Sequence, residues 1–206
     1  MHCLFKKLGI LLVVLSLQTG TANAKEPENL LYLTLEYGEV VIQLRPDLAP
    51  KHVARIKELT RQGFYDGIIF HRVIAGFMAQ TGDPTGTGRG GSGKNLDAEF
   101  SSEPFKRGTL GMARSRDPDS ADSQFFINFA PASHLNGKYT VWGQVIEGME
   151  HVDRIKRGSP PRDPDRIIRM RVGADVKKYP RVAPPRLARD RPIGANGVGR
   201  PSCMEG

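Results

Sequence analysis

Cysteine is scarce in this 206-residue chain. The two that are present, Cys3 and Cys203, lie at opposite ends of the sequence. A disulfide-stabilised miniature fold is therefore excluded, because no cysteine pair is available inside the region between them. The chain must be stable through packing, and its length suits one domain with a substantial hydrophobic core.

Long hydrophobic runs are missing as well. The apolar run Leu8 to Leu17 is too short to span a bilayer. It follows Lys6 and Lys7 and precedes Ala22-Asn23-Ala24, a small-x-small cleavage pattern. Residues 1–24 are thus predicted to be a cleavable export signal, with the mature chain starting near Lys25. An uncleaved membrane anchor is the alternative, and no stable membrane insertion of the mature chain is expected.

Charge of one sign gathers only near the C-terminus. The whole chain carries +8, but residues 25–176 hold 21 basic and 20 acidic side chains. Nucleic-acid binding by this region is not predicted, because it lacks a basic excess. Residues 177–206 hold seven Lys or Arg and two Asp or Glu, and are rich in proline and glycine. They are predicted to be a disordered tail; contact with anionic lipid or an acidic partner stays open.

Short apolar segments predict a mostly β domain over residues 25–176. Segments 31–36 and 40–44 flank Tyr37-Gly38-Glu39 and predict a hairpin. Val53, Ile56 and Leu59 have helical spacing within a predicted helix at 49–62. Because strands and helices do not alternate regularly, the pattern argues against a doubly wound sheet and favours strands that are closed or sandwiched. Further strands are predicted at 68–73, 77–80, 109–113, 124–128, 141–146 and 167–172, and a second helix at 150–157.

Two glycine motifs suggest nucleotide binding but lack its context. Residues 86–91 fit GxGxxG, and residues 88–94 nearly fit a P-loop, with Asn95 in place of Ser or Thr. Both motifs need a long apolar helix afterwards, and residues 94–100 are too short and too polar to supply one. We therefore interpret this stretch as a flexible glycine loop beside a groove.

Neither a metal site nor a covalent nucleophile is recognisable. Ser92 lacks the flanking glycines of a nucleophile elbow. The histidines beyond the signal show no close metal-ligand spacing, so no metal or other cofactor is predicted; these are His52, His71, His134 and His151. This pattern fits a reaction that makes and breaks no covalent bond.

The segment Phe70 to Asp83, FHRVIAGFMAQTGD, is the most informative part of the chain. It is followed in order by GTLGMARS from Gly108, SQFFINFA from Ser123 and HLNGKYTVWG from His134. Over about residues 30–172 these motifs resemble the cyclophilin family of peptidyl-prolyl cis/trans isomerases. The resemblance implies a closed eight-stranded antiparallel barrel capped by two α-helices.

The resemblance also assigns roles to individual residues. Arg72 matches the catalytic arginine, and Gln80 the glutamine that orients the substrate backbone. Without the resemblance to cyclophilins, we would interpret Arg72 as part of a surface ion pair and the apolar residues of these motifs as part of the core. Phe77, Met78, Phe126 and Leu135 match the pocket for the proline ring, Ala113 and Gln124 match groove-lining positions, and Arg114, His134 and Tyr139 complete the predicted substrate-binding set.

Alternation along the strand predicted at 68–73 makes a separate prediction. It places Arg72 on one face with Phe70 and Ile68, and Val73 on the other. Phe70 and Phe125 are nevertheless assigned to the core, pointing away from the functional positions.

Four positions depart from the best-known cyclophilins. Arg114 replaces a common Asn in a segment whose backbone pairs with the peptide, and Tyr139 replaces a frequent His, as in bacterial-looking members. His134 stands where drug-sensitive members carry Trp, which predicts weak cyclosporin binding. Trp142 replaces a usual Phe on a core strand and predicts a change of packing only.

Together these observations predict a monomeric, periplasmic prolyl isomerase. Its partners would be proline-containing polypeptides that are unfolded or partly folded, and its role would be to remove a slow folding step. The alternative is a peptide-binding chaperone or scaffold whose isomerase activity is incidental.

Overall fold

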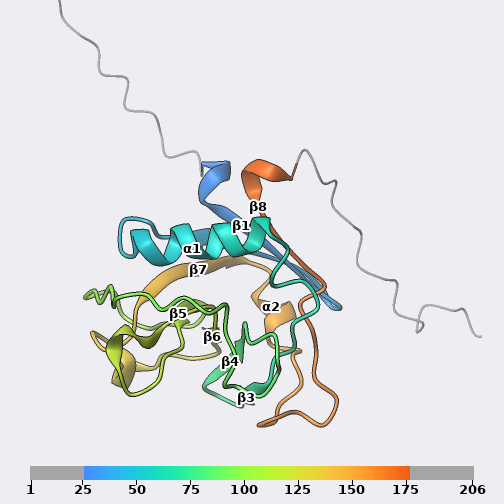
Figure 1. Cartoon of the computed structure of the whole chain (residues 1–206). Coiled ribbons are helices and arrows are strands. Elements are labelled where there is room, and N and C mark those ends of the chain that lie inside the picture. Colours follow the sequence, from blue (N-terminus) through green and yellow to red (C-terminus); the bar gives the residue numbers. More distant parts are fainter. Residues whose placement is uncertain (1–25, 177–206) are drawn as a thin grey trace, which may run out of the picture.

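The computed structural model describes residues 26–176, which form eight strands and two α-helices (Figure 1). The predicted signal and the predicted tail lie outside the described residues. No helix within residues 26–176 is both long and apolar enough to cross a bilayer. The strands are β1 (Leu30–Leu35), β2 (Gly38–Leu44), β3 (Arg72–Ile74), β4 (Met78–Thr81), β5 (Thr109–Met112), β6 (Phe125–Asn128), β7 (Val141–Glu147) and β8 (Arg169–Val172).

The sheet is antiparallel and open, so the predicted closed barrel is wrong. Its strand order is β3-β4-β6-β5-β7-β2-β1-β8, which leaves β3 and β8 as the two edges. The segment that follows the second helix runs beside β3 and takes up its free edge (Figure 1). There Val73 and Gly158 exchange backbone hydrogen bonds of 2.7 and 2.9 Å. This segment occupies the edge that closure would require, and the sheet ends as a half-barrel.

Helix α1 (Pro50–Arg61) lies across one side of the curved sheet and packs against β8 (Figure 1). Its Val53, Ile56 and Leu59 are buried, as their spacing predicted. Pro50 occupies the first turn, where a missing N–H costs nothing. The next two backbone N–H groups donate to the Glu99 carboxylate, each at 3.0 Å.

The second helix is much shorter than the predicted 150–157. Helix α2 spans only Met149–Val152. Beyond it the N–H groups of Arg154 and Ile155 bond to carbonyls three residues back instead of four. The tighter turn ends the α-helix. Short 3₁₀ helices complete the elements: η1 (Pro27–Asn29), η2 (Pro118–Ser120), η3 (Ser133–Leu135) and η4 (Gly173–Asp175).

Buried side chains form two hydrophobic clusters, one on each face of β6. Phe125 and Ile127 belong to the larger cluster, together with Trp142, which meets Phe125 edge-on at 5.3 Å between ring centroids. Phe126, between them, belongs to the smaller cluster with Met78 and Leu135 and the partly buried Tyr139. Alternation along β6 therefore separates a core face from a second face that can carry a site.

The alternation predicted for residues 68–73 is wrong on one point. Phe70 and Val73 both lie in the larger cluster, whereas Arg72 points away from it. Only Arg72–Ile74 is a strand, because the chain before it bonds elsewhere: the Phe70 N–H donates to the Asp165 carbonyl at 2.9 Å. The period of two therefore does not extend back to Phe70, and its assignment to the core is confirmed.

Candidate active site

Strand register assembles one row of side chains across four strands. Arg72 on β3 lies opposite Gln80 on β4, Gln80 opposite Phe126 on β6, and Phe126 opposite Gly111 on β5. Opposed residues in an antiparallel sheet project to the same face. A Cβ at Gly111 would lie 2.5 Å from Phe126 Cζ and 2.6 Å from Phe105 Cε1, so only glycine leaves room for these rings.

The row opens into an apolar cavity of about 300 Å³. Its floor is aromatic: Phe105 stacks on Phe126 at 5.8 Å, and Tyr139 meets Phe126 edge-on at 6.0 Å. On the rim, the rings of Phe77 and His134 are 5.3 Å apart. Every predicted site residue except Gln124 lines this cavity: Arg72, Phe77, Met78, Gln80, Ala113, Arg114, Phe126, His134, Leu135 and Tyr139.

Arg72 is held at the edge of this cavity by weak, neutral partners. Its Nη1 donates to Gln80 Oε1 at 3.2 Å and lies 3.9 Å from Met78 Sδ. No carboxylate of residues 26–176 forms an ion pair with it. The guanidinium is only partly buried, so its charge and its remaining hydrogens are available for a further interaction.

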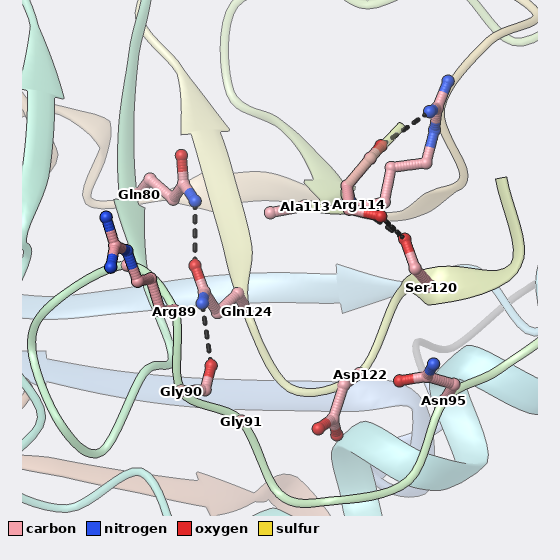
Figure 2. Close-up of a pocket in the computed structure, with 12 residues that line it drawn as sticks. Gln80, Arg89, Gly90, Gly91, Asn95, Ala113, Arg114, Ser120, Asp122 and Gln124 are labelled. Carbon is pink, nitrogen blue, oxygen red and sulfur yellow. Dashed lines mark hydrogen bonds between the residues drawn. The ribbon is translucent and has the colours of Figure 1, made fainter. Parts of the chain in front are cut away.

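A second, polar cavity of about 430 Å³ adjoins the first and shares Gln80, Ala113 and Arg114 with it. Figure 2 shows Gln80, Gln124 and Gly90 joined in line: Gln80 Nε2 donates to Gln124 Oε1 at 2.9 Å, and Gln124 Nε2 to the Gly90 carbonyl at 2.8 Å. The predicted groove residue Gln124 thus lies here. The other lining residues are Gly88, Arg89, Gly90, Gly91, Asn95, Ser115, Ser120 and Asp122.

The glycine-rich loop of the polar cavity is organised by Asp83, which is only 1% exposed. Its carboxylate accepts hydrogen bonds from Thr85 N (2.7 Å), Thr85 Oγ1 (2.8 Å) and Gly88 N (2.6 Å). Burial alone would raise the pKa of Asp83, but the hydrogen bonds from Thr85, Gly90 and Gly88 outweigh it and lower the pKa to about 2. A Cβ at Gly90 would lie 2.2 Å from this carboxylate.

Sequence reasoning placed a glycine loop beside a groove but missed the polar residues opposite it. The Asp122 carboxylate accepts hydrogen bonds from the Ser92 hydroxyl and from the Gly93 N–H, the latter at 2.8 Å. These bonds fix the far end of the loop. Arg89 and Asn95 also face the cavity (Figure 2). Polar residues in a loop without periodicity carried no signal that would have grouped them.

The described residues offer no metal site. Within residues 26–176, no group of three or more His, Cys, Asp or Glu side chains lies close enough together to hold an ion.

Comparison with known proteins identifies the family. Residues 30–172 match the family model described as cyclophilin type peptidyl-prolyl cis-trans isomerase/CLD. A Brucella suis protein named "Probable peptidyl-prolyl cis-trans isomerase" is 53% identical over 174 residues, covering 76% of this chain and 89% of that protein. Bacillus subtilis peptidyl-prolyl cis-trans isomerase B is 43% identical over 130 residues, covering 62% of this chain and 90% of that protein.

Solved structures agree with the sequence relatives. A cyclophilin from Hirschia baltica superposes with a TM-score of 0.68 at 30% identity, covering 73% of this chain and 76% of that one. A Cryptosporidium parvum cyclophilin type isomerase, crystallised in the presence of the dipeptide Ala-Pro, gives 0.65 at 32% identity, covering 69% of this chain and 98% of that one. The chain belongs to the cyclophilin-type peptidyl-prolyl cis-trans isomerases.

Proposed function

We propose that this chain accelerates rotation about X-Pro bonds with Arg72 as its electrostatic catalyst. The observation that carries the proposal is the position of an arginine without a carboxylate partner at the edge of a cavity floored by aromatic rings. Each half of the site has a distinct task, one apolar and one electrostatic.

The reaction requires a twisted amide. Resonance sets the rotation barrier at about 18–20 kcal/mol, and only bonds that precede proline populate both isomers appreciably. A donor close to the prolyl nitrogen localises its lone pair and weakens that resonance. The Arg72 guanidinium is permanently charged and has hydrogens that its bond to Gln80 leaves free. It therefore stabilises the twisted state more than either planar isomer, which is the condition for catalysis.

The apolar cavity supplies the fixed point of the rotation. A proline ring held against Phe126, Met78 and Leu135 cannot turn, so the acyl side of the bond rotates instead. The Ala-Pro dipeptide present with the Cryptosporidium parvum relative is a ligand of the chemistry this cavity would take. The polar cavity that adjoins it favours extended clients, which are unfolded or partly folded polypeptides.

The proposal extends to where the enzyme acts and to its inhibitor. The basic start, apolar run and cleavage pattern of residues 1–24 support action on exported polypeptides in the periplasm, as a monomer. There it would remove the slow X-Pro step of folding. The exposed His134 on the cavity rim supports weak binding of cyclosporin.

The test is isomerisation of a short X-Pro peptide by the purified protein and by Arg72→Ala. Removing one preorganised donor should lower kcat/KM by on the order of 10²–10³-fold. Arg116→Ala is the matched control, since Arg116 is exposed and lines neither cavity. Urea unfolding must show that the Arg72 variant remains folded.

Two outcomes would overturn the proposal. An Arg72→Ala enzyme as fast as wild type would remove Arg72 from catalysis. A wild-type protein no faster than buffer would favour the peptide-binding chaperone instead. That alternative predicts suppressed aggregation of proline-free clients, which an isomerase should not produce.

A further inference from the structure

The side chain of Arg114 connects two segments that wall the groove. It follows β5, and its guanidinium reaches across to the segment before β7. There Nε and Nη2 donate to the Lys138 carbonyl at 3.2 and 2.9 Å. Nη1 donates back to the carbonyls of Ser115 and Arg116, at 3.0 and 3.3 Å. One side chain thus gathers three carbonyls from two loops.

Within residues 26–176, no other hydrogen bond joins residues 113–120 to residues 136–139. Residues 113–120 are otherwise bonded among themselves, as Ser115 is to Ser120, or to segments other than 136–139. Lys138 bonds through its N–H only to Leu135, within its own loop. The β5–β7 pairing joins the two walls at their base, where the Met112 N–H donates to the Thr140 carbonyl at 3.0 Å, and Arg114 fastens them beyond that point.

The same guanidinium also fixes an aromatic ring of the apolar cavity. Its central carbon lies 4.5 Å from the centroid of the Tyr139 ring and 5.9 Å from that of the exposed Phe100. Tyr139 meets Phe126 edge-on at 6.0 Å. The tyrosine ring is thus in contact with a cation and with the cavity floor, and a cation over a ring is attractive.

Arg114 is poorly placed to offer its charge to a substrate. Each of its three nitrogen atoms already donates to a backbone carbonyl. Arg89, in contrast, lines the polar cavity and is exposed. The two arginines of the polar cavity therefore have different tasks.

We propose that Arg114 is a positioning residue for the isomerase reaction. It joins the two groove walls and holds Tyr139 against Phe126, so that the proline cavity is formed before a substrate arrives. This inference rests on the proposed function, because it concerns the same cavity. Preorganisation of this kind strengthens binding by reducing the ordering cost on association.

The test compares Arg114→Ala, Arg114→Lys and the control Arg116→Ala, with kcat and KM measured separately on an X-Pro peptide. Losing preorganised binding should raise KM about tenfold and change kcat less than about twofold. Lysine keeps the charge near Tyr139 but loses the planar fork, so it should rescue only part of the loss. Arg116→Ala keeps the backbone carbonyl that Arg114 uses and should match wild type.

A double-mutant cycle decides whether Arg114 acts through the tyrosine. In a Tyr139→Ala background, Arg114→Ala should change KM by less than about twofold. An equal tenfold effect in both backgrounds, or no effect on KM in either, would overturn the proposal.

A spectroscopic readout separates this inference from the proposed function. In wild type, NMR signals of the Tyr139 ring should carry the shift of a ring held beside Phe126, and Arg114→Ala should move them toward those of an exposed tyrosine. Unmoved signals would overturn the positioning role even if the enzyme is active. Moved signals in a protein that does not isomerise X-Pro peptides would sink the proposed function and leave the positioning of Tyr139 standing.

Discussion

The two cavities of the groove share three residues but are built in different ways. The apolar one is centred on strand residues whose register holds them, such as Phe126, and Phe126 also contacts the rings of Phe105 and Tyr139. The polar one is made from a loop held by Asp83 and by two glutamine amides. Many packing contacts hold the apolar cavity in place, whereas only a few hydrogen bonds hold the loop of the polar cavity. The apolar cavity should therefore be rigid, and the polar cavity adaptable.

The largest effect that would test this comparison is expected at Phe126. Its ring is 5% exposed and contacts two other rings. Phe126→Ala should lower the free energy of unfolding by about 3–5 kcal/mol, because a cavity replaces the ring, and it should also raise KM for an X-Pro peptide. Urea unfolding and steady-state kinetics measure both.

Gln124→Ala is the counterpart from the polar cavity. Gln124 is only half-buried and bonds to Gln80 and to the Gly90 carbonyl. Its replacement should cost about 1 kcal/mol or less, the net contribution of such a hydrogen bond. Equal losses of stability at Phe126 and Gln124 would contradict the distinction between a rigid and an adaptable cavity.

Sequence patterns anticipated the apolar cavity far better than the polar one. Strands such as β2 and β7 were predicted close to their bounds, because alternating apolar residues and turn glycines mark them. The motifs gave Arg72, Gln80 and Phe126, yet only the strand order β3-β4-β6-β5 makes them neighbours. That order depends on pairings between residues that are distant in sequence, and local sequence patterns do not predict such pairings.

The errors have a common physical cause. The closed barrel and the alternation at Phe70 both failed where residues 158–167 bond to the edge near β3. The polar cavity was missed because Asp83 orders its loop through bonds to backbone N–H groups. Such bonds depend on backbone conformation and leave no periodic trace in the sequence.

Asp83→Asn would test the adaptable cavity more directly. The amide places an NH₂ group where backbone N–H donors now point. The free energy of unfolding at pH 7 should therefore fall by about 1–3 kcal/mol. Short X-Pro peptides that fill only the apolar cavity should keep their KM, while longer peptides that reach the glycine loop should bind less well. Equal loss for both peptide lengths would mean that the two cavities respond as one.

The pH dependence provides a check on the same residue. In the folded state the pKa of Asp83 is lowered to about 2, below its unfolded value of about 4. Its stabilisation is therefore present above pH 4 and is lost as the pH falls from about 4 through about 2. The stability difference between wild type and Asp83→Asn should shrink over this range. Asp163→Asn should give only a weaker trend of the same sign, because its ion pair with Lys156 also lowers the pKa of Asp163 but is exposed and screened by solvent.

The last expected effect concerns inhibitor binding at the rim, where the apolar cavity is least apolar. His134 is exposed on the rim of the cavity, and its ring lies 5.3 Å from that of Phe77 between centroids. His134→Trp adds a large apolar face and an N–H donor, and should strengthen cyclosporin binding about tenfold, since such ring contacts contribute about 0.5–1.5 kcal/mol. Calorimetric titration would measure the cyclosporin affinity, with His134→Phe as the variant that adds the apolar face but no donor.

Because the buried floor at Phe126 is untouched, isomerisation of a short X-Pro peptide by His134→Trp should stay within about threefold of wild type, since the rim adds little to transition-state binding. Nanomolar cyclosporin affinity in the wild type would show instead that the floor alone suffices, and that the rim contributes nothing to the inhibitor.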